Sequence, residues 1–230
     1  MKTALITGAS KGIGEAVARR LIEKGYTCIS LARNYENCSI TSDNFIPLIC
    51  DLTDQKQLLA VIHKIKGEYE IDLLINNAGI GYFGLHEELN PAKIHAMVAT
   101  NLEAPLILVN QFLRMLKEDH GQIINIESIT AAQCNPHGCA YGATKAGMLS
   151  FSKSLFQEIR KYGVKVTSIL PDMTKTNFYD HSNFSEGDSY DSYLLPDEVA
   201  DAVCYAITSR DGLVLSEITL QPQKHQIRRK

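Results

Sequence analysis

The chain has 230 residues, of which 45% are hydrophobic and 21% charged, as is typical of a single globular domain. A net charge of -3 excludes the basic field that would direct the protein to nucleic acid or an acidic membrane. Six cysteines without disulfide-framework spacing, no signal-peptide pattern and no stretch approaching the length of a membrane span favour the cytoplasm. We therefore expect neither nucleic acid nor membrane as a partner.

Short apolar runs predict strands along the whole chain. They are residues 3–7, 27–32, 45–50, 71–76, 121–126, 164–170 and 212–220. Apolar residues at helical spacing predict amphipathic helices between these strands. The helices are expected at 14–25, 54–68 (with Thr53 as its cap), after Pro91, at 105–116, from 141 to about 161, and at 196–208.

This alternation predicts one α/β domain over residues 1–230, a parallel sheet with helices on both faces. The segment 175–195 has no clear period, and so long a loop in a compact domain is usually functional or mobile. We expect it to be a substrate loop. The basic tail 224–230 is interpreted as a solvated chain end.

A glycine-rich turn, TGASKGIG (7–14), follows the first strand and leads into a helix. Its glycines allow the backbone to approach a diphosphate, and the helix N-terminus favours the negative charge. The second strand ends at Ala32 and Arg33, where an NAD site usually has an acidic residue, and Lys11 lies in the glycine turn. Two cations without a carboxylate favour a 2′-phosphate, so the predicted cofactor is NADP(H).

Asp51 ends the third strand and has two equally supported interpretations. Its carboxylate can accept a hydrogen bond from an adenine amino group, or it can cap the following turn. The sequence does not decide between them.

Three polar side chains are predicted to meet at the cofactor. Tyr141 and Lys145 are four positions apart, one helical turn, and Ser128 ends a strand whose carboxyl end faces the ligand crevice. The charge of Lys145, together with the oxidised nicotinamide, favours the tyrosinate form of Tyr141. Tyr141 could then exchange a proton with a substrate oxygen that Ser128 holds. The alternative is an ordinary surface pair on a helix.

Five motifs in order make the chain resemble the short-chain dehydrogenase/reductase family over about residues 3–220. They are TGASKGIG (7–14), NNAG (76–79), Asn101, Ser128 and YGATK (141–145). The resemblance implies a Rossmann-type, doubly wound fold and a catalytic tetrad of Ser128, Tyr141, Lys145 and Asn101. It also implies a homodimer or homotetramer, formed through helix 105–116 and the helix after Tyr141.

The resemblance and the motifs together place a set of residues along the cofactor, with Asn77 and Gly79 mainly in supporting roles. The set is Gly8, Ser10, Lys11, Gly12, Ile13, Gly14, Arg33, Asp51, Leu52, Asn77, Ala78, Gly79, Tyr141, Lys145, Pro171, Thr174 and Thr176.

The sequence departs from the family pattern at two acidic residues. Asp172 follows Pro171 where the family often has glycine, and it is expected to face the nicotinamide region. Glu127 precedes Ser128 where a small residue is usual. The end of the chain also lacks the Gly-Gly ending typical of acyl-carrier-protein ketoreductases.

The segment CNPHGC brings Cys134, His137 and Cys139 close together, but its spacing fits no common zinc site, so no metal is expected. It is expected to line the substrate mouth. The function expected by resemblance is NADP(H)-dependent interconversion of a carbonyl and an alcohol in a small-molecule substrate. The alternatives are a 3-oxoacyl carrier-protein reductase and, less favoured because Tyr141 and Lys145 are both present, a nucleotide-sensing binding protein.

Overall fold

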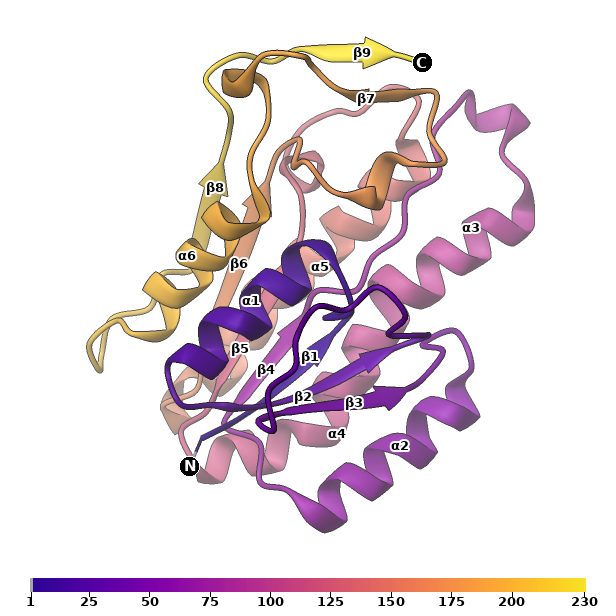
Figure 1. Ribbon diagram of the computed structural model, residues 1–230. Coiled ribbons are helices and arrows are strands. Elements are labelled where there is room, and N and C mark those ends of the chain that lie inside the picture. Colours follow the sequence, from indigo (N-terminus) through magenta and orange to yellow (C-terminus); the bar gives the residue numbers. More distant parts are fainter. Residues whose placement is uncertain (1) are drawn as a thin grey trace.

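A seven-stranded parallel sheet forms the centre of the protein in the computed structural model, which describes residues 2–230 (Figure 1). The strands stand in the order β3-β2-β1-β4-β5-β6-β8. Their bounds are β1 (Thr3–Thr7), β2 (Thr27–Ala32), β3 (Phe45–Ile49), β4 (Leu73–Asn76), β5 (Gln122–Ile126), β6 (Lys165–Pro171) and β8 (Glu217–Leu220). The predicted doubly wound parallel sheet is confirmed.

Helices cover both faces of this sheet. They are α1 (Gly12–Glu23), α2 (Gln55–Glu68), α3 (Pro91–Val98), α4 (Ala104–Glu118), α5 (Cys139–Ile159) and α6 (Pro196–Ile207). Successive residues of each strand point to opposite faces, so Ala4 and Ile6 of β1 pack in the cluster of α1 and α6, whereas Leu5 packs in the cluster of α2, α4 and α5. Two dry layers of apolar side chains therefore fix the orientation of every strand.

The strand order reverses between β1 and β4. From β1 the chain winds outward through β2 to β3, and then returns to place β4 on the other side of β1. The carboxyl ends of β1 and β4 consequently meet at the point where open α/β sheets bind ligands. The turn after β1 is the glycine-rich segment, and the turn after β4 is NNAG.

Several predicted element boundaries change in the structure. Asp54, rather than Thr53, caps α2, because its Oδ1 accepts hydrogen bonds from the backbone N–H groups of Lys56 and Gln57, each at 3.0 Å. The last sheet strand is confined to β8, and the segment before it is irregular.

The helices predicted after Pro91 and at 105–116 form one continuous helical segment, Pro91–Glu118, through a π-helical turn at Ala99–Glu103. This segment is long and apolar enough, by length and composition, to span a membrane, which corrects the expectation that no stretch approaches that length. Half of its most apolar window is buried inside the protein, with Leu108, Phe112 and Leu116 in the core. It is packed as a core helix.

The basic tail is not a free end. Its strand β9 (Ile227–Arg229) pairs antiparallel with β7 (Phe184–Glu186) of the loop 175–195. The pair lies beyond the end of the sheet where β6 and β8 finish (Figure 1). Single-sequence reasoning missed both strands because three-residue strands carry almost no periodicity.

Candidate active site

The glycine-rich turn between β1 and α1 has the backbone conformation that a diphosphate requires. Gly8 and Gly12 have φ angles of +74° and +62°, a region in which side chains other than glycine are strained. The α1 helix begins at Gly12, so its unpaired N–H groups lie at this turn. The half-buried Ser10 and Ile13 and the exposed Lys11 complete the turn. These residues fit the phosphates of a dinucleotide.

Gly14 and the NNAG segment hold the turn in place. A Cβ atom at Gly14 would overlap the carbonyl oxygen of Gly8 and the side-chain amide of Asn77. Asn77 Nδ2 donates to the carbonyl oxygens of Thr7 (2.9 Å) and Gly8 (3.1 Å). The hydroxyl oxygen of Thr7 accepts from the backbone N–H groups of Asn77 and Ala78, each at 3.0 Å. Asn77 and Ala78 thus support the turn from the neighbouring strand.

The end of β2 and the glycine turn each carry one exposed cation that could meet a nucleotide. Ala32 is buried at the strand end, and Arg33 follows it exposed, as is Lys11 in the glycine turn. Asp51, after β3, accepts hydrogen bonds at Oδ1 from Thr53 N (2.9 Å) and Oγ1 (2.8 Å). Of the two interpretations of Asp51, the structure displays the turn cap. Leu52 beside it is half-buried.

The helix α5 brings Tyr141 and Lys145 to one face, and both are buried, with exposed fractions of 7% and 4%. Lys145 Nζ lies 5.8 Å from the centroid of the Tyr141 ring and donates a hydrogen bond of 2.9 Å to the carbonyl oxygen of Ile126. Ser128, two residues after Ile126, hydrogen-bonds to Tyr141 and is also buried. The surface-pair interpretation does not fit this burial.

Asn101 reaches the same place from the π-helical turn Ala99–Glu103. Its side chain exchanges two hydrogen bonds with the backbone of Ile80: Oδ1 accepts from N (2.9 Å) and Nδ2 donates to O (2.8 Å). Nδ2 also contacts the hydroxyl oxygen of Thr144 at 3.1 Å. A Cβ atom at Gly79 would lie 3.5 Å from Lys145 Nζ and 3.6 Å from Asn101 Oδ1. Gly79 therefore packs against two of the four predicted catalytic residues, Lys145 and Asn101.

The electrostatics of Tyr141 differ from the sequence-based expectation. Burial raises the pKa of Tyr141 to about 12, and the hydrogen bond from Ser128 only partly opposes this. Burial also lowers the pKa of Lys145 to about 8, against the opposing effect of Glu127. Burial is thus the largest effect on the pKa of Tyr141. Tyr141 in this environment is a neutral phenol, suited to donating a proton.

The segment after β6 lies against the glycine turn. Pro171 ends β6 and is buried, and Thr174 forms an isolated β-bridge with Leu194. A Cβ atom at Gly12 would lie 3.3 Å from Thr176 Cγ2. Thr176 therefore borders the glycine turn, and Pro171 and Thr174 lie just before it in the same segment.

Asp172 does not stand as a free acid in this segment. Its Oδ1 accepts a hydrogen bond of 2.7 Å from Met173 N, and its Oδ2 lies 3.8 Å from His225 Nδ1 in the C-terminal tail. The carboxylate is thus engaged by its own backbone and by the tail.

Aromatic rings surround Tyr141. The ring centroid of Tyr141 lies 5.5 Å from that of Phe83 and 5.7 Å from that of Phe178. Phe83 in turn packs on Tyr179 at 6.1 Å and on Phe184 at 5.2 Å. We call these five residues the aromatic cluster. Sequence reasoning missed it because Tyr141 lies in α5 and the other four members come from two separate loops, the one after β4 and the segment 175–195.

The segment CNPHGC packs next to this cluster. The backbone N–H of Gly84 donates to the carbonyl oxygen of His137 at 2.7 Å, which joins the segment to the loop after β4. Cys134, His137 and Cys139 are exposed. Within residues 2–230, no group of three or more His, Cys, Asp and Glu side chains is arranged to hold a metal ion.

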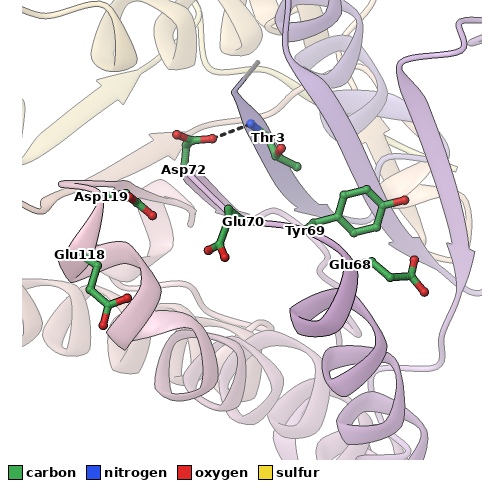
Figure 2. A pocket seen from close by; sticks show the side chains of 7 residues that line it. All are labelled: Thr3, Glu68, Tyr69, Glu70, Asp72, Glu118 and Asp119. Atoms are coloured by element: carbon green, nitrogen blue, oxygen red, sulfur yellow. Dashed lines mark hydrogen bonds between the residues drawn. The ribbon is translucent and has the colours of Figure 1, made fainter.

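A separate hollow lies elsewhere in the protein. It measures about 540 Å³ and is lined by Thr3, Glu68, Tyr69, Glu70, Asp72, Glu118 and Asp119 (Figure 2). Thr3 begins β1 and Asp72 precedes β4, so the hollow is at the amino ends of the strands, opposite the tetrad. Its carboxylates would repel a nucleotide phosphate. The cofactor turn and the tetrad therefore do not share this hollow.

Comparison with known proteins gives consistent results. The family model for short chain dehydrogenases matches residues 2–186. An uncharacterised oxidoreductase of Staphylococcus haemolyticus is 29% identical, over 96% of this chain and 97% of the relative. The 3-oxoacyl-[acyl-carrier-protein] reductase FabG of Escherichia coli is 35% identical, over 76% of this chain and 75% of the relative.

Solved structures agree with these relatives. An alcohol dehydrogenase from the archaeon Thermococcus sibiricus, solved in complex with 5-hydroxy-NADP, superposes with a TM-score of 0.88. It is 27% identical and covers 98% of both chains.

Proposed function

The chain belongs to the short-chain dehydrogenase family of oxidoreductases, and from this premise we propose that it interconverts a carbonyl and an alcohol with NADP(H). One observation carries the proposal: Gly79, one strand away from the glycine turn, borders Lys145 and Asn101, and Lys145 in turn lies over the ring of Tyr141 and is hydrogen-bonded to the strand end that leads to Ser128. Four residues from three separate elements would not meet there by packing alone. Fold likeness by itself would not support a specific chemistry.

Each member of the tetrad has a role that its surroundings support. Ser128 holds the substrate oxygen by a hydrogen bond, and Tyr141 gives its proton to that oxygen in reduction or takes it in oxidation. Lys145, hydrogen-bonded to Ile126 O, presents a cation beneath the phenol and the ribose. Asn101 fixes the backbone of Ile80 and borders Lys145. The nicotinamide, when bound, supplies or accepts the hydride.

The glycine turn and the end of β2 support NADP(H) over NAD(H). Arg33 and Lys11 are both exposed there, and the buried Ala32 stands where a carboxylate would bind a ribose 2′-hydroxyl. Because both cations are exposed, either can pair with a 2′-phosphate, and the free protein does not have to keep a charge buried before the cofactor binds. The complex of the Thermococcus relative with an NADP derivative is in keeping with this choice.

The aromatic cluster supports an apolar, small substrate. Phe83 and Phe178 touch Tyr141, so a carbonyl that approaches the phenol must lie against aromatic rings. Rings stabilise flat or aliphatic surfaces and offer no partner to a carboxylate. We infer that the substrate is an aromatic or aliphatic ketone or aldehyde, or the matching alcohol.

The similarity to the Escherichia coli reductase favours a second candidate, reduction of a 3-oxoacyl group on an acidic carrier protein. Such a carrier requires a basic surface at the mouth, and the basic tail does lie over the substrate loop. However, Lys224 pairs with Asp191 at 2.8 Å and Arg228 with Asp188 at 2.9 Å. Two of the four Lys and Arg side chains of the tail are thus paired with acids of the loop, which weakens the basic surface, and the small-molecule substrate is preferred. The buried tetrad argues against a nucleotide-sensing protein.

The cellular compartment and the oligomeric state are proposed on the cysteines and the family resemblance. All six cysteines are free thiols, as suits a reducing cytoplasm. By family resemblance we propose a homodimer or homotetramer that uses the outer faces of α4 and α5.

The test is turnover on a panel of carbonyls with each cofactor. We expect NADPH oxidation with apolar aromatic or aliphatic carbonyls, weaker rates with carboxylated ones, and little rate with NADH. Preference for an acyl-carrier-protein thioester over every free carbonyl would favour the second candidate. Absence of turnover throughout, despite cofactor binding, would favour a sensing protein.

A further inference from the structure

A buried carboxylate stands next to the tetrad, and none of the roles above uses it. Glu127 lies between Ile126, whose carbonyl oxygen accepts the hydrogen bond of Lys145, and Ser128. Its side chain is 3% exposed. Burying a carboxylate is costly unless it is paired or protonated, so its presence in this position calls for a physical reason.

The partners of Glu127 come from both neighbouring elements. Oε1 accepts a hydrogen bond of 2.8 Å from the hydroxyl of Ser168 in β6 and contacts the hydroxyl of Ser152 in α5 at 3.1 Å. Oε2 is buried and finds no hydrogen-bond partner among residues 2–230. Ser152 follows Lys145 by seven residues, two helical turns, so Glu127 faces the same side of α5 as the ammonium.

The hydroxyl of Ser152 allows two protonation states of Glu127. Ser152 Oγ accepts from Asn125 Nδ2 at 2.8 Å and also lies 2.8 Å from the carbonyl oxygen of Met148. A hydroxyl has one proton to donate. In the first state the Ser152 hydroxyl donates to the carbonyl oxygen of Met148, and a protonated Glu127 donates its own proton to Ser152. In the second state the Ser152 hydroxyl donates to Glu127, whose carboxylate is charged. Rotation of one hydroxyl therefore serves both states without backbone movement.

The charged groups around Glu127 are few. Lys145 faces it from α5, and Glu217 acts on it from β8, where Glu217 pairs with Lys153 at 3.1 Å. Burial raises the pKa of Glu127 to about 7, against the lowering effects of Ser168, Lys145 and Ser152. Within the described residues, Glu127 is the charged group that opposes the burial-driven loss of the Lys145 proton. The two charges therefore stabilise each other: the carboxylate of Glu127 favours the charged form of Lys145, and the ammonium of Lys145 favours the charged form of Glu127.

We propose that Glu127 is a positioning residue that keeps the ammonium of Lys145 charged beneath Tyr141. It acts through Lys145 and touches neither substrate nor cofactor. Its consequence for catalysis rests on the function proposed above, whereas its effect on Lys145 is a property of the folded protein alone. The position before the catalytic serine thus sets the pH range in which the tetrad holds its cation.

The first test reads the proton of Lys145 directly. Protein labelled with carbon-13 at lysine Cε is titrated by NMR, and the signal of Lys145 is assigned by its loss in Lys145→Met. We expect a midpoint near the value given above in the parent protein and a midpoint about one pH unit or more lower in Glu127→Gln. The matched control is Glu217→Gln, which removes the neighbouring acid and should leave the midpoint of Lys145 nearly unchanged.

The second readout is the pH profile of kcat/KM for the parent enzyme and Glu127→Gln. The basic limb should move to lower pH by the same amount as the NMR midpoint, with little change at pH 6. An unchanged midpoint of Lys145 in Glu127→Gln overturns the positioning role of Glu127. The proposed function is judged separately, because it would still stand if Lys145→Met were inactive. If Glu127→Gln does not fold, the titration curve of Lys145 in the parent protein provides the test. The proposal requires a second inflection near pH 7, caused by Glu127, and a curve with a single step overturns it.

Discussion

Lys145 Nζ donates a 2.9 Å hydrogen bond to the carbonyl oxygen of Ile126. This contact ties the helix that carries Tyr141 to the strand that leads into Ser128, so the phenol and the hydroxyl share one rigid frame. Because Lys145 is 4% exposed, the ammonium is held there by protein groups rather than by bulk water. The predictions below test this frame and the cofactor turn beside it.

Removing the Arg33 cation at the end of β2 should weaken the binding of NADPH and leave the binding of NADH nearly unchanged. In Arg33→Ala, the dissociation constant for NADPH should rise by roughly tenfold or more, because a charge-assisted hydrogen bond is worth about 1.5–3 kcal/mol. The constant for NADH should barely change. Fluorescence titration with both cofactors measures this, with the exposed Arg160→Ala as the matched control. Equal affinities of the parent protein for NADPH and NADH would contradict the assignment.

Adding one methyl group at Gly14 should damage the turn. Its Cβ would overlap Gly8 O and the amide of Asn77, so Gly14→Ala should destabilise the protein by about 1–3 kcal/mol and weaken cofactor binding. The control is Gly67→Ala near the end of α2, where a Cβ meets nothing within 4 Å. That variant should gain about 0.5–1 kcal/mol from helix propensity. Urea unfolding compares the two, and equal effects would refute the packing argument.

The C-terminal tail should hold the substrate loop. Strand β9 pairs with β7, and Lys230 Nζ donates to the carbonyl oxygen of Tyr179 at 2.8 Å. Deleting residues 224–230 should therefore speed limited proteolysis within 175–195, and NADPH should slow that cleavage in the parent protein by ordering the loop. Mass spectrometry of the fragments locates the cuts. Cleavage at the same rate with and without the tail, and with and without NADPH, would argue against both roles.

The buried acid should give stability a distinctive pH dependence. The pKa of Glu127 is raised from its ordinary value of 4.5 to about 7, so its folding contribution is fully present below pH 4.5 and is lost as pH rises through 7. Relative to Glu127→Gln, the parent should lose on the order of 1–3 kcal/mol of unfolding free energy between pH 5 and 8, since one pKa unit is about 1.4 kcal/mol. Urea midpoints at each pH measure the difference, and a flat difference would contradict the raised pKa.

Local patterns predicted the parallel sheet because its five inner strands are buried on both faces and its helices are amphipathic. The apolar runs ending in Thr7, Asn76 and Ile126 are visible in the sequence, as is Pro196 at the start of its helix. What stayed hidden depends on contacts between distant segments. The pairing of β7 with β9 is an example, because each strand has three residues and neither can be stable without the other.

The tetrad was foreseeable for a different reason. Tyr141 and Lys145 follow from helical spacing, Ser128 from its place at the carboxyl end of a strand, and Asn101 only from the resemblance to a family. The π-helical turn that aims Asn101 has no recognisable sequence signal. The neutral state of Tyr141 could not be foreseen either, because desolvation depends on the aromatic cluster that folds over it.

The most direct test is a steady-state assay of Tyr141→Phe beside Lys145→Ala, with an NADPH titration of each. If the phenol moves the proton, Tyr141→Phe should lose on the order of 10²–10⁴ in kcat while its affinity for NADPH stays near that of the parent protein. Lys145→Ala should lose both turnover and affinity, because its ammonium serves the phenol and the ribose. Retention of most of the parent activity by Tyr141→Phe would contradict the account.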